Sequence, residues 1–174
     1  MKKSVGIWEF FGFALTSLLG TLLHFLYDFT GGSAFVAPFS GVNESTWEHM
    51  KLLFWPMLLF CVIQSRFFRD REDFLCIKLK GALIGLWLIP VLFYTYNGII
   101  GKSPDWINIT IFFISAAVAY LYEARRLKGD EMRHCSKRGT IIIFCVIALM
   151  FIIFTFKTPE LGIFRDPLTG GYGI

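Results

Sequence analysis

Long apolar runs alternate with short polar blocks along the whole chain. A helix needs roughly 20 predominantly apolar residues to cross the hydrocarbon core of a bilayer. Five runs come near this length, and they cover about residues 7–27, 49–64, 75–100, 106–122 and 140–156. The pattern predicts an all-α fold, a polytopic transmembrane helical bundle of about five spans, built as a single integral membrane domain over residues 1–174.

The composition agrees with a membrane protein. Apolar residues make up 55% of the chain, charged residues only 17%, and the mean hydropathy is +0.60. A soluble domain carries about 25% charged residues, so water is not the main solvent of this chain. The predicted partner is the lipid bilayer, and nucleic acid is excluded because the formal net charge of +4 is explained by the loops.

The distribution of Lys and Arg predicts the orientation. Thirteen of the 17 fall at the N-terminus and around the loops after the second and fourth runs. Cytoplasmic loops collect positive charge, which predicts a multipass protein of the cell membrane with a cytoplasmic N-terminus and an extracellular C-terminus. This side collects Lys2, Lys3, Arg66, Arg69, Arg71, Lys78, Lys80, Arg125, Arg126, Lys128, Arg133, Lys137 and Arg138; the other side has Lys51, Lys102, Lys157 and Arg165.

Four ionisable residues near the ends of runs are interpreted as interfacial. Lys51, Lys78 and Lys80 have long side chains that can reach the headgroups from inside a span. Glu9 is an isolated carboxylate near the cytoplasmic end of the first run.

Small residues predict close helix packing. Gly81 and Gly85 are four residues apart in the third run, and Ser115, Ala116 and Ala119 lie in the fourth. Small side chains let membrane helices approach closely. Five spans in so short a chain leave self-association or another membrane-protein partner open.

The cysteines predict no disulfide and no cysteine metal site. Cys61, Cys76, Cys135 and Cys145 show neither a framework nor a metal-ligand spacing.

A polar stripe runs along the extracellular half of the first predicted helix. Ser17, Thr21, His24 and Asp28 follow the spacing 4, 3, 4, which places them on one helix face. Ionisable groups at membrane depth are costly and indicate function by default. A structural alternative is that His24 and Asp28 simply pair across one helical turn.

A second polar group precedes the second run. Ser45 and Glu48 fit a capping box, which leaves Glu44 and His49 without a structural explanation. Imidazoles and carboxylates suit a divalent metal such as zinc. The candidate ligands are therefore His24, Asp28 and His49, with Glu44 and Glu48 as candidate catalytic carboxylates.

Candidate substrate contacts lie at the same end of the predicted bundle. Tyr94 and Asn97 end the third run, and the tail that carries Arg165 combines turn residues with the apolar anchors Phe164 and Tyr172. We expect the tail to fold across the bundle mouth, with Arg165 near the carboxylates as a clamp for an anionic substrate. The alternatives are interfacial belt residues and a plain surface tail.

Three segments resemble a known family. HFLYDFTGG, NESTWEHMKLLFWP and FRDPLTGGYGI are similar to segments of a family of small multipass membrane proteins of Gram-positive bacteria, a domain of unknown function. The resemblance covers essentially the whole chain and implies a class without an activity. The chain also resembles membrane-embedded metal hydrolases of the alkaline ceramidase type in setting His and Asp near one membrane face, but it lacks their paired histidines.

The sequence is compatible with three functions. The polar cluster is the metal site of a membrane-embedded hydrolase, the cation or proton site of a transporter or channel component, or the docking point of a non-catalytic membrane protein. A transporter needs its polar lining to continue to the cytoplasmic side. The concentration of polar residues at the extracellular end therefore favours the hydrolase or the docking protein.

Overall fold

The predicted helices are all present. The computed structural model describes residues 2–101, 104–129 and 134–174, and within these residues every long element is an α-helix. Lys102 and Arg133, which belong to the charge count, lie outside the described residues. The elements are α1 (Lys2–Phe29), α2 (Thr46–Ser65), α3 (Phe74–Ile100), α4 (Asp105–Lys128), α5 (Lys137–Phe156) and a short 3₁₀ helix η1 (Gly162–Phe164).

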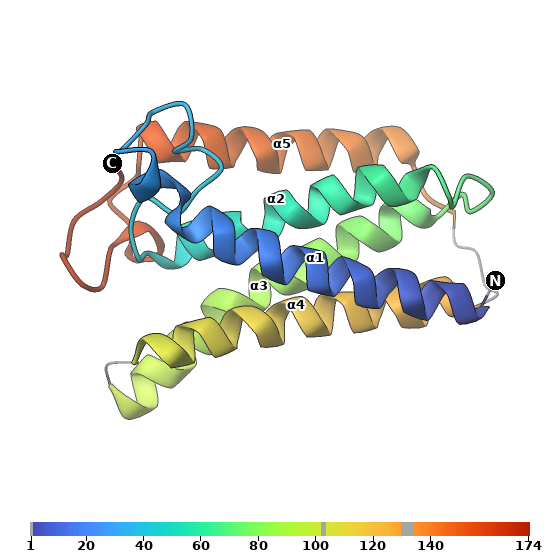
Figure 1. The fold of residues 1–174 in the computed structure, drawn as a ribbon, viewed down its shortest axis with the longest axis horizontal. Helices are drawn as coiled ribbons and strands as arrows, with labels where there is room; N and C mark the ends of the chain where they lie inside the picture. The colour runs from blue at the N-terminus through green and yellow to red at the C-terminus, as the bar shows by residue number, and fades with distance from the viewer. Residues whose placement is uncertain (1, 102–103, 130–133) are drawn as a thin grey trace.

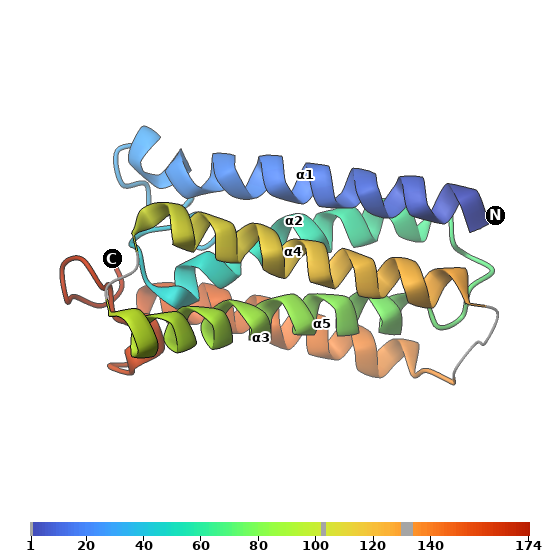
Figure 2. The same ribbon diagram turned by 90° about the horizontal axis from the view of Figure 1, so that it is seen from below.

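Helices α1 to α4 form a four-helix bundle, and α5 lies against α2 and α3 (Figures 1 and 2). The two chain termini lie at opposite ends of the molecule (Figure 1). We call these the N-terminal end and the C-terminal end of the bundle. The C-terminal end also holds the loop between α1 and α2, because α1 ends and α2 begins there.

Helix α2 is the most enclosed element. Leu53 and Phe54 are completely buried, and the Phe54 ring packs on Phe151 of α5 with 5.2 Å between centroids. Four helical segments of the described chain are long and apolar enough to cross a membrane, and they lie in α1, α3, α4 and α5. Because its neighbours cover it, α2 can carry polar residues that a lipid-exposed span could not. The count of five spans stays a prediction.

Close packing through small residues, which was predicted for the third and fourth helices, is found where α3 packs on α4. A methyl group added at Gly85 would lie 3.4 Å from the Ala119 Cβ and 3.5 Å from the Ser115 carbonyl oxygen. Ser115 and Ala119 are completely buried. The small residues therefore bring the two backbones together, as expected for membrane helices.

Three interpretations of single residues were wrong. Lys51 and Lys78 do not reach an interface, because both side chains are buried in the bundle. Glu9 is buried too, at 2% exposure. Sequence position placed each of them near the end of a run, but neighbouring helices cover all three.

The prediction of no disulfide was also wrong. Cys76 in the first turn of α3 is joined to Cys135, just before α5, with their Cα atoms 6.3 Å apart. The two residues are 59 positions apart in sequence. Only the fold brings them together, so their spacing carried no signal.

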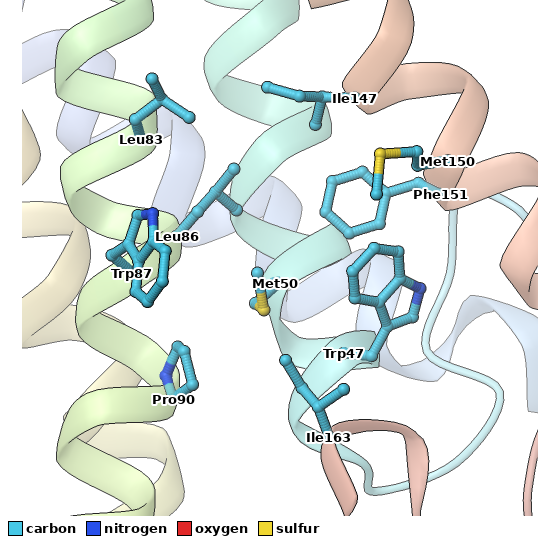
Figure 3. Close-up of a pocket in the computed structure, with 10 residues that line it drawn as sticks. All are labelled: Trp47, Met50, Leu83, Leu86, Trp87, Pro90, Ile147, Met150, Phe151 and Ile163. Carbon is cyan, nitrogen blue, oxygen red and sulfur yellow. The ribbon is translucent and has the colours of Figure 1, made fainter. Parts of the chain in front are cut away.

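An apolar cavity of about 250 Å³ lies between α2, α3 and α5 (Figure 3). Trp47 and Phe151 line one side, and Leu86 and Trp87 line the other. Its lining holds no ionisable side chain, so the polar chemistry predicted from the sequence lies elsewhere.

Candidate metal centre

Three of the predicted site residues converge at the C-terminal end of the bundle. His24 Nε2 lies 3.6 Å from Glu44 Oε1, and His49 Nε2 lies 3.6 Å from Glu44 Oε2. Ligand atoms of these three residues all lie within 4.8 Å of one another. Neighbouring ligands of tetrahedral zinc are roughly 3.3 Å apart, because each bond is about 2.0–2.1 Å long. Small side-chain movements would therefore suffice to form a three-ligand site.

The local backbone structure determines where these three side chains lie. His24 belongs to α1 and His49 to the first turn of α2. Asn43 Oδ1 accepts a hydrogen bond from the Ser45 amide at 2.9 Å, and the Ser45 hydroxyl accepts one from the Glu48 amide at 3.4 Å. An Asx turn followed by an N-cap thus leads the chain into α2. Glu44 stands between the two turns and projects toward the histidines.

A hydrogen bond determines which ring nitrogen of His49 carries a proton. Its Nδ1 lies 2.9 Å from the Ser45 carbonyl oxygen, which can only accept. Nδ1 therefore carries the proton, and Nε2 faces Glu44 with its lone pair unless it too is protonated. A lone pair and a carboxylate attract each other only through a shared cation, either a proton or a metal ion. A carbonyl that orients a ligand histidine in this way is a common feature of metal sites.

The site borders a second cavity. About 110 Å³ of space is lined by His24 and His49 together with Leu52, Phe112 and Phe113. The side chains of His24 and Glu44 are 26% and 36% exposed. The cluster is thus partly open and lies next to an apolar space.

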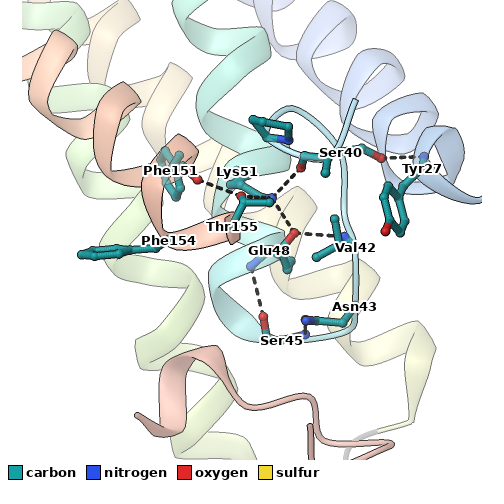
Figure 4. A network of polar contacts seen from close by, with 12 residues as sticks. Tyr27, Ser40, Val42, Asn43, Ser45, Glu48, Lys51, Phe151, Phe154 and Thr155 are labelled. Carbon is teal, nitrogen blue, oxygen red and sulfur yellow. Dashed lines mark hydrogen bonds and ion pairs between the residues drawn. The ribbon is translucent and has the colours of Figure 1, made fainter. Parts of the chain in front are cut away.

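Glu48 has a different environment from Glu44. Its carboxylate lies 2.6 Å from the Lys51 ammonium and accepts a hydrogen bond from the Val42 amide at 3.0 Å (Figure 4). Lys51 also donates to the Ala37 carbonyl and the Thr155 hydroxyl, each at 2.9 Å. The N-cap half of the predicted capping box is confirmed, but the Glu48 side chain does not return to Ser45. Glu48 instead belongs to a buried network that joins the loop, α2 and α5.

Asp28 is not part of the converging set. It is exposed in the last turn of α1, one turn beyond His24. Among the described residues, the group that could hold a metal ion contains Glu44 instead of Asp28.

The predicted substrate residues surround the site less closely. Tyr94 is 45% exposed near the end of α3, and Asn97 donates a hydrogen bond to the Phe93 carbonyl at 2.8 Å. Arg165 is exposed, and its guanidinium group lies beside Gly170. The structure brings none of the three into the His24–Glu44–His49 cluster, so their substrate roles stay predictions.

The tail folds across the bundle mouth, as expected. Phe164 is buried and packs on Trp47, with 4.7 Å between ring centroids. The Asn43 side-chain amide donates to the Gly173 carbonyl at 3.0 Å. The tail is thereby tied to the segment that holds Glu44.

A second polar cluster, at the N-terminal end, was missed by sequence reasoning. Glu9, Gln64, Lys78 and Glu123 come from four different helices and are all buried. Lys78 Nζ lies 3.1 Å from Glu9 Oε2 and also pairs with Glu123. Gln64 Nε2 donates to Glu9 Oε1 at 2.6 Å.

The buried face of α1 contained a signal for this second cluster. Glu9, Gly12, Thr16 and Gly20 are buried at helical spacing, and His24 continues the same row. Thr16 is hydrogen-bonded to Tyr120 of α4 at 2.7 Å. Small and polar residues are those through which membrane helices pack on one another, and on α1 this buried face runs from one cluster to the other.

The comparisons add a family without an activity. A family model described as a family of unknown function (DUF6512) matches residues 1–174. No curated protein and no solved structure matches the chain.

Proposed function

Because the chain belongs to DUF6512, a family of unknown function, we propose its function from its own geometry: it is a membrane protein that binds a divalent metal ion through His24, Glu44 and His49. The observation that carries the proposal is the convergence of their ligand atoms within 4.8 Å. Two imidazoles and a carboxylate suit zinc, which is the metal we expect.

The metal site is proposed to be hydrolytic. Three protein ligands leave one tetrahedral position of zinc for water, as in catalytic zinc sites. A zinc ion held by these residues would lower the pKa of a bound water and so supply a strong nucleophile near neutral pH. A nearby carboxylate would have to take the proton of such a water, and Asp28, exposed one turn beyond His24, is the residue we propose for this role. Glu48 is proposed to be structural, because its carboxylate is engaged by Lys51.

The substrate is proposed to be a lipid or lipid-linked molecule. The apolar cavity beside the histidines is suited to an acyl chain, and it is bounded by helices with exposed apolar residues such as Phe25 and Ile109. Arg165, Tyr94 and Asn97 are proposed to meet a polar or anionic head group. With the N-terminus in the cytoplasm, as the charge distribution predicts, the site opens to the extracellular side.

Metal content tests the proposal. The full chain is purified in detergent after growth with added zinc, and the metal-to-protein ratio is measured by elemental mass spectrometry. We expect a ratio near one for the wild type and for Glu160→Gln, a control at an exposed carboxylate. His24→Ala, His49→Ala and Glu44→Gln should each lose most of the metal while eluting as the wild type does on size exclusion.

Activity is then measured on nitrophenyl esters of increasing acyl length in detergent micelles. We expect hydrolysis that is removed by a chelator, restored by zinc and lost in His49→Ala. A wild type without metal under these conditions would reject the proposal. If metal is bound but no ester is hydrolysed, the proposed metal site stands and the proposed hydrolase activity is rejected.

A second candidate function is transport of a cation or protons, and the polar buried face of α1 favours it. This face continues from His24 to the cluster around Glu9, so polar residues reach the N-terminal end. A transporter needs such continuity. In vesicles containing a trapped zinc indicator, transport predicts uptake that Glu123→Gln abolishes, whereas a hydrolase predicts no uptake.

A further inference from the structure

The cluster at the N-terminal end contains more negative than positive groups. Two carboxylates, Glu9 and Glu123, share a single ammonium, that of Lys78. All three side chains are at most 2% exposed. The ammonium also lies over the rings of Phe60 and Tyr120, 5.4 and 5.0 Å from their centroids. The ionic groups are therefore enclosed by apolar and aromatic side chains.

Within residues 2–101, 104–129 and 134–174, no other titratable group facing the cluster balances this excess of negative charge. Glu9 comes from α1, Lys78 from α3, and Glu123 from α4. The remaining titratable neighbours in the described chain are Cys61 of α2 and Tyr120 of α4, and neither can carry a positive charge. Gln64 of α2 is neutral. With both carboxylates ionised, one negative charge would remain buried, which is strongly unfavourable.

Two buried oxygens also need a hydrogen. Within the described residues, Glu123 Oε1 and Gln64 Oε1 have no hydrogen-bond partner. Both residues are completely buried, so solvent does not satisfy these atoms. Gly81 of α3 leaves the space that the Glu123 carboxyl occupies, because a methyl group there would overlap it. A glycine thus makes room for the acid, and the acid retains a free oxygen.

We propose that this cluster is a proton-binding site, in which Glu9 and Glu123 together hold one exchangeable proton beside the Lys78 ammonium. Two carboxyl groups that cannot both ionise share a proton, and the shared proton belongs to the pair. The proton comes from water and joins one carboxylate oxygen, while Lys78 keeps its own proton throughout. The cluster is then electrically neutral. The proposal does not depend on a metal at the other end.

Infrared spectroscopy of the purified full chain at neutral pH tests this site through the carbonyl stretch of a protonated carboxyl group. We expect a carboxylic acid band that shifts in deuterium oxide. Glu9→Gln and Glu123→Gln should each remove the intensity of one acid group, because the remaining carboxylate then balances Lys78 alone. Lys78→Met should instead increase the band, because both carboxyl groups must then be protonated.

Controls keep the test decisive. Glu160→Gln, at an exposed position, should leave the band unchanged. Each variant is first checked for wild-type elution on size exclusion, and either glutamine variant suffices because both predict the same loss. The proposal is overturned if the wild type shows no acid band, or if a folded glutamine variant keeps the wild-type intensity.

Discussion

At the scale of single residues, Lys51 connects three parts of the chain. Its ammonium contacts the Glu48 carboxylate, the Ala37 carbonyl in the loop between α1 and α2, and the Thr155 hydroxyl of α5. The side chain is completely buried. A buried ion pair adds little compared with apolar packing, but removing one partner leaves an uncompensated charge.

Lys51→Met is therefore expected to destabilise the protein by about 3–5 kcal/mol, because Glu48 remains buried without its cation. Thermal unfolding in detergent, followed by size exclusion, measures the loss. Lys157→Met, at an exposed position, is the matched control and should change little. Adding Glu48→Gln to Lys51→Met should recover part of the stability; a double variant no more stable than the single one would contradict this role.

The candidate metal ligands were predictable from sequence to the extent that helix geometry determines where they lie. His24 and His49 lie on predicted helices that end and begin at the same side of the bundle. The sequence prediction named Asp28 as a ligand and Glu44 as a catalytic carboxylate, because the sequence does not show how far α1 continues. It runs to Phe29 and carries Asp28 a further turn, about 5.4 Å, beyond His24. The loop returns Glu44 to the histidines instead.

At the scale of elements, glycines set how closely α1 approaches its neighbours. A methyl group at Gly12 would lie 2.5 Å from both the Phe60 and the Tyr120 ring. Gly20 is similarly close to Phe112. These rings cannot all retreat, because Phe60, Tyr120 and Phe112 are themselves buried. The polar and glycine face of α1 is thus held against α2 and α4.

Gly12→Ala is expected to destabilise the bundle by about 1–3 kcal/mol through overpacking. Gly98→Ala is the control, since nothing lies within 4 Å of its added methyl group. For Gly98→Ala we expect no loss of stability, and a gain of up to about 1 kcal/mol because alanine has a higher helix propensity than glycine. Thermal unfolding of the two variants in the same detergent makes the comparison. Equal effects of the two substitutions would show that the seam along α1 is not tightly packed.

The five helices could be predicted from the apolar runs, but the surroundings of α2 could not. Its sequence reads as a short span, and the structure explains its Lys51 and Gln64 by burial among the other helices. Lys78 was assigned to an interface because a charged block precedes α3. Only packing against α1 and α4 brings it to Glu9 and Glu123, and no local pattern reports such contacts.

At the scale of the whole molecule, the termini lie at opposite ends of the bundle (Figure 1). The excess of Lys and Arg predicts that the N-terminal end faces the cytoplasm. The Cys76–Cys135 disulfide lies at this same end, whereas disulfides are rare in the cytosol. Charge and cysteine chemistry therefore predict opposite orientations.

Reporter fusions determine the topology. An odd number of spans predicts that fusions to the two termini report opposite sides. We expect a fluorescent protein to be active at the N-terminus and alkaline phosphatase to be active after Ile174. Phosphatase activity at the N-terminus alone would reverse the orientation, as the disulfide favours. The same side for both termini would contradict five spans.

X-ray absorption spectroscopy at the zinc edge of the zinc-loaded protein shows whether His24, Glu44 and His49 hold one metal ion. We expect a four-coordinate ion with nitrogen and oxygen neighbours and the outer-shell scattering of two imidazoles, one of which is lost in His49→Ala. Sulfur neighbours, or a spectrum without imidazole scattering, would place the metal elsewhere in the chain and rule out a site formed by these three residues.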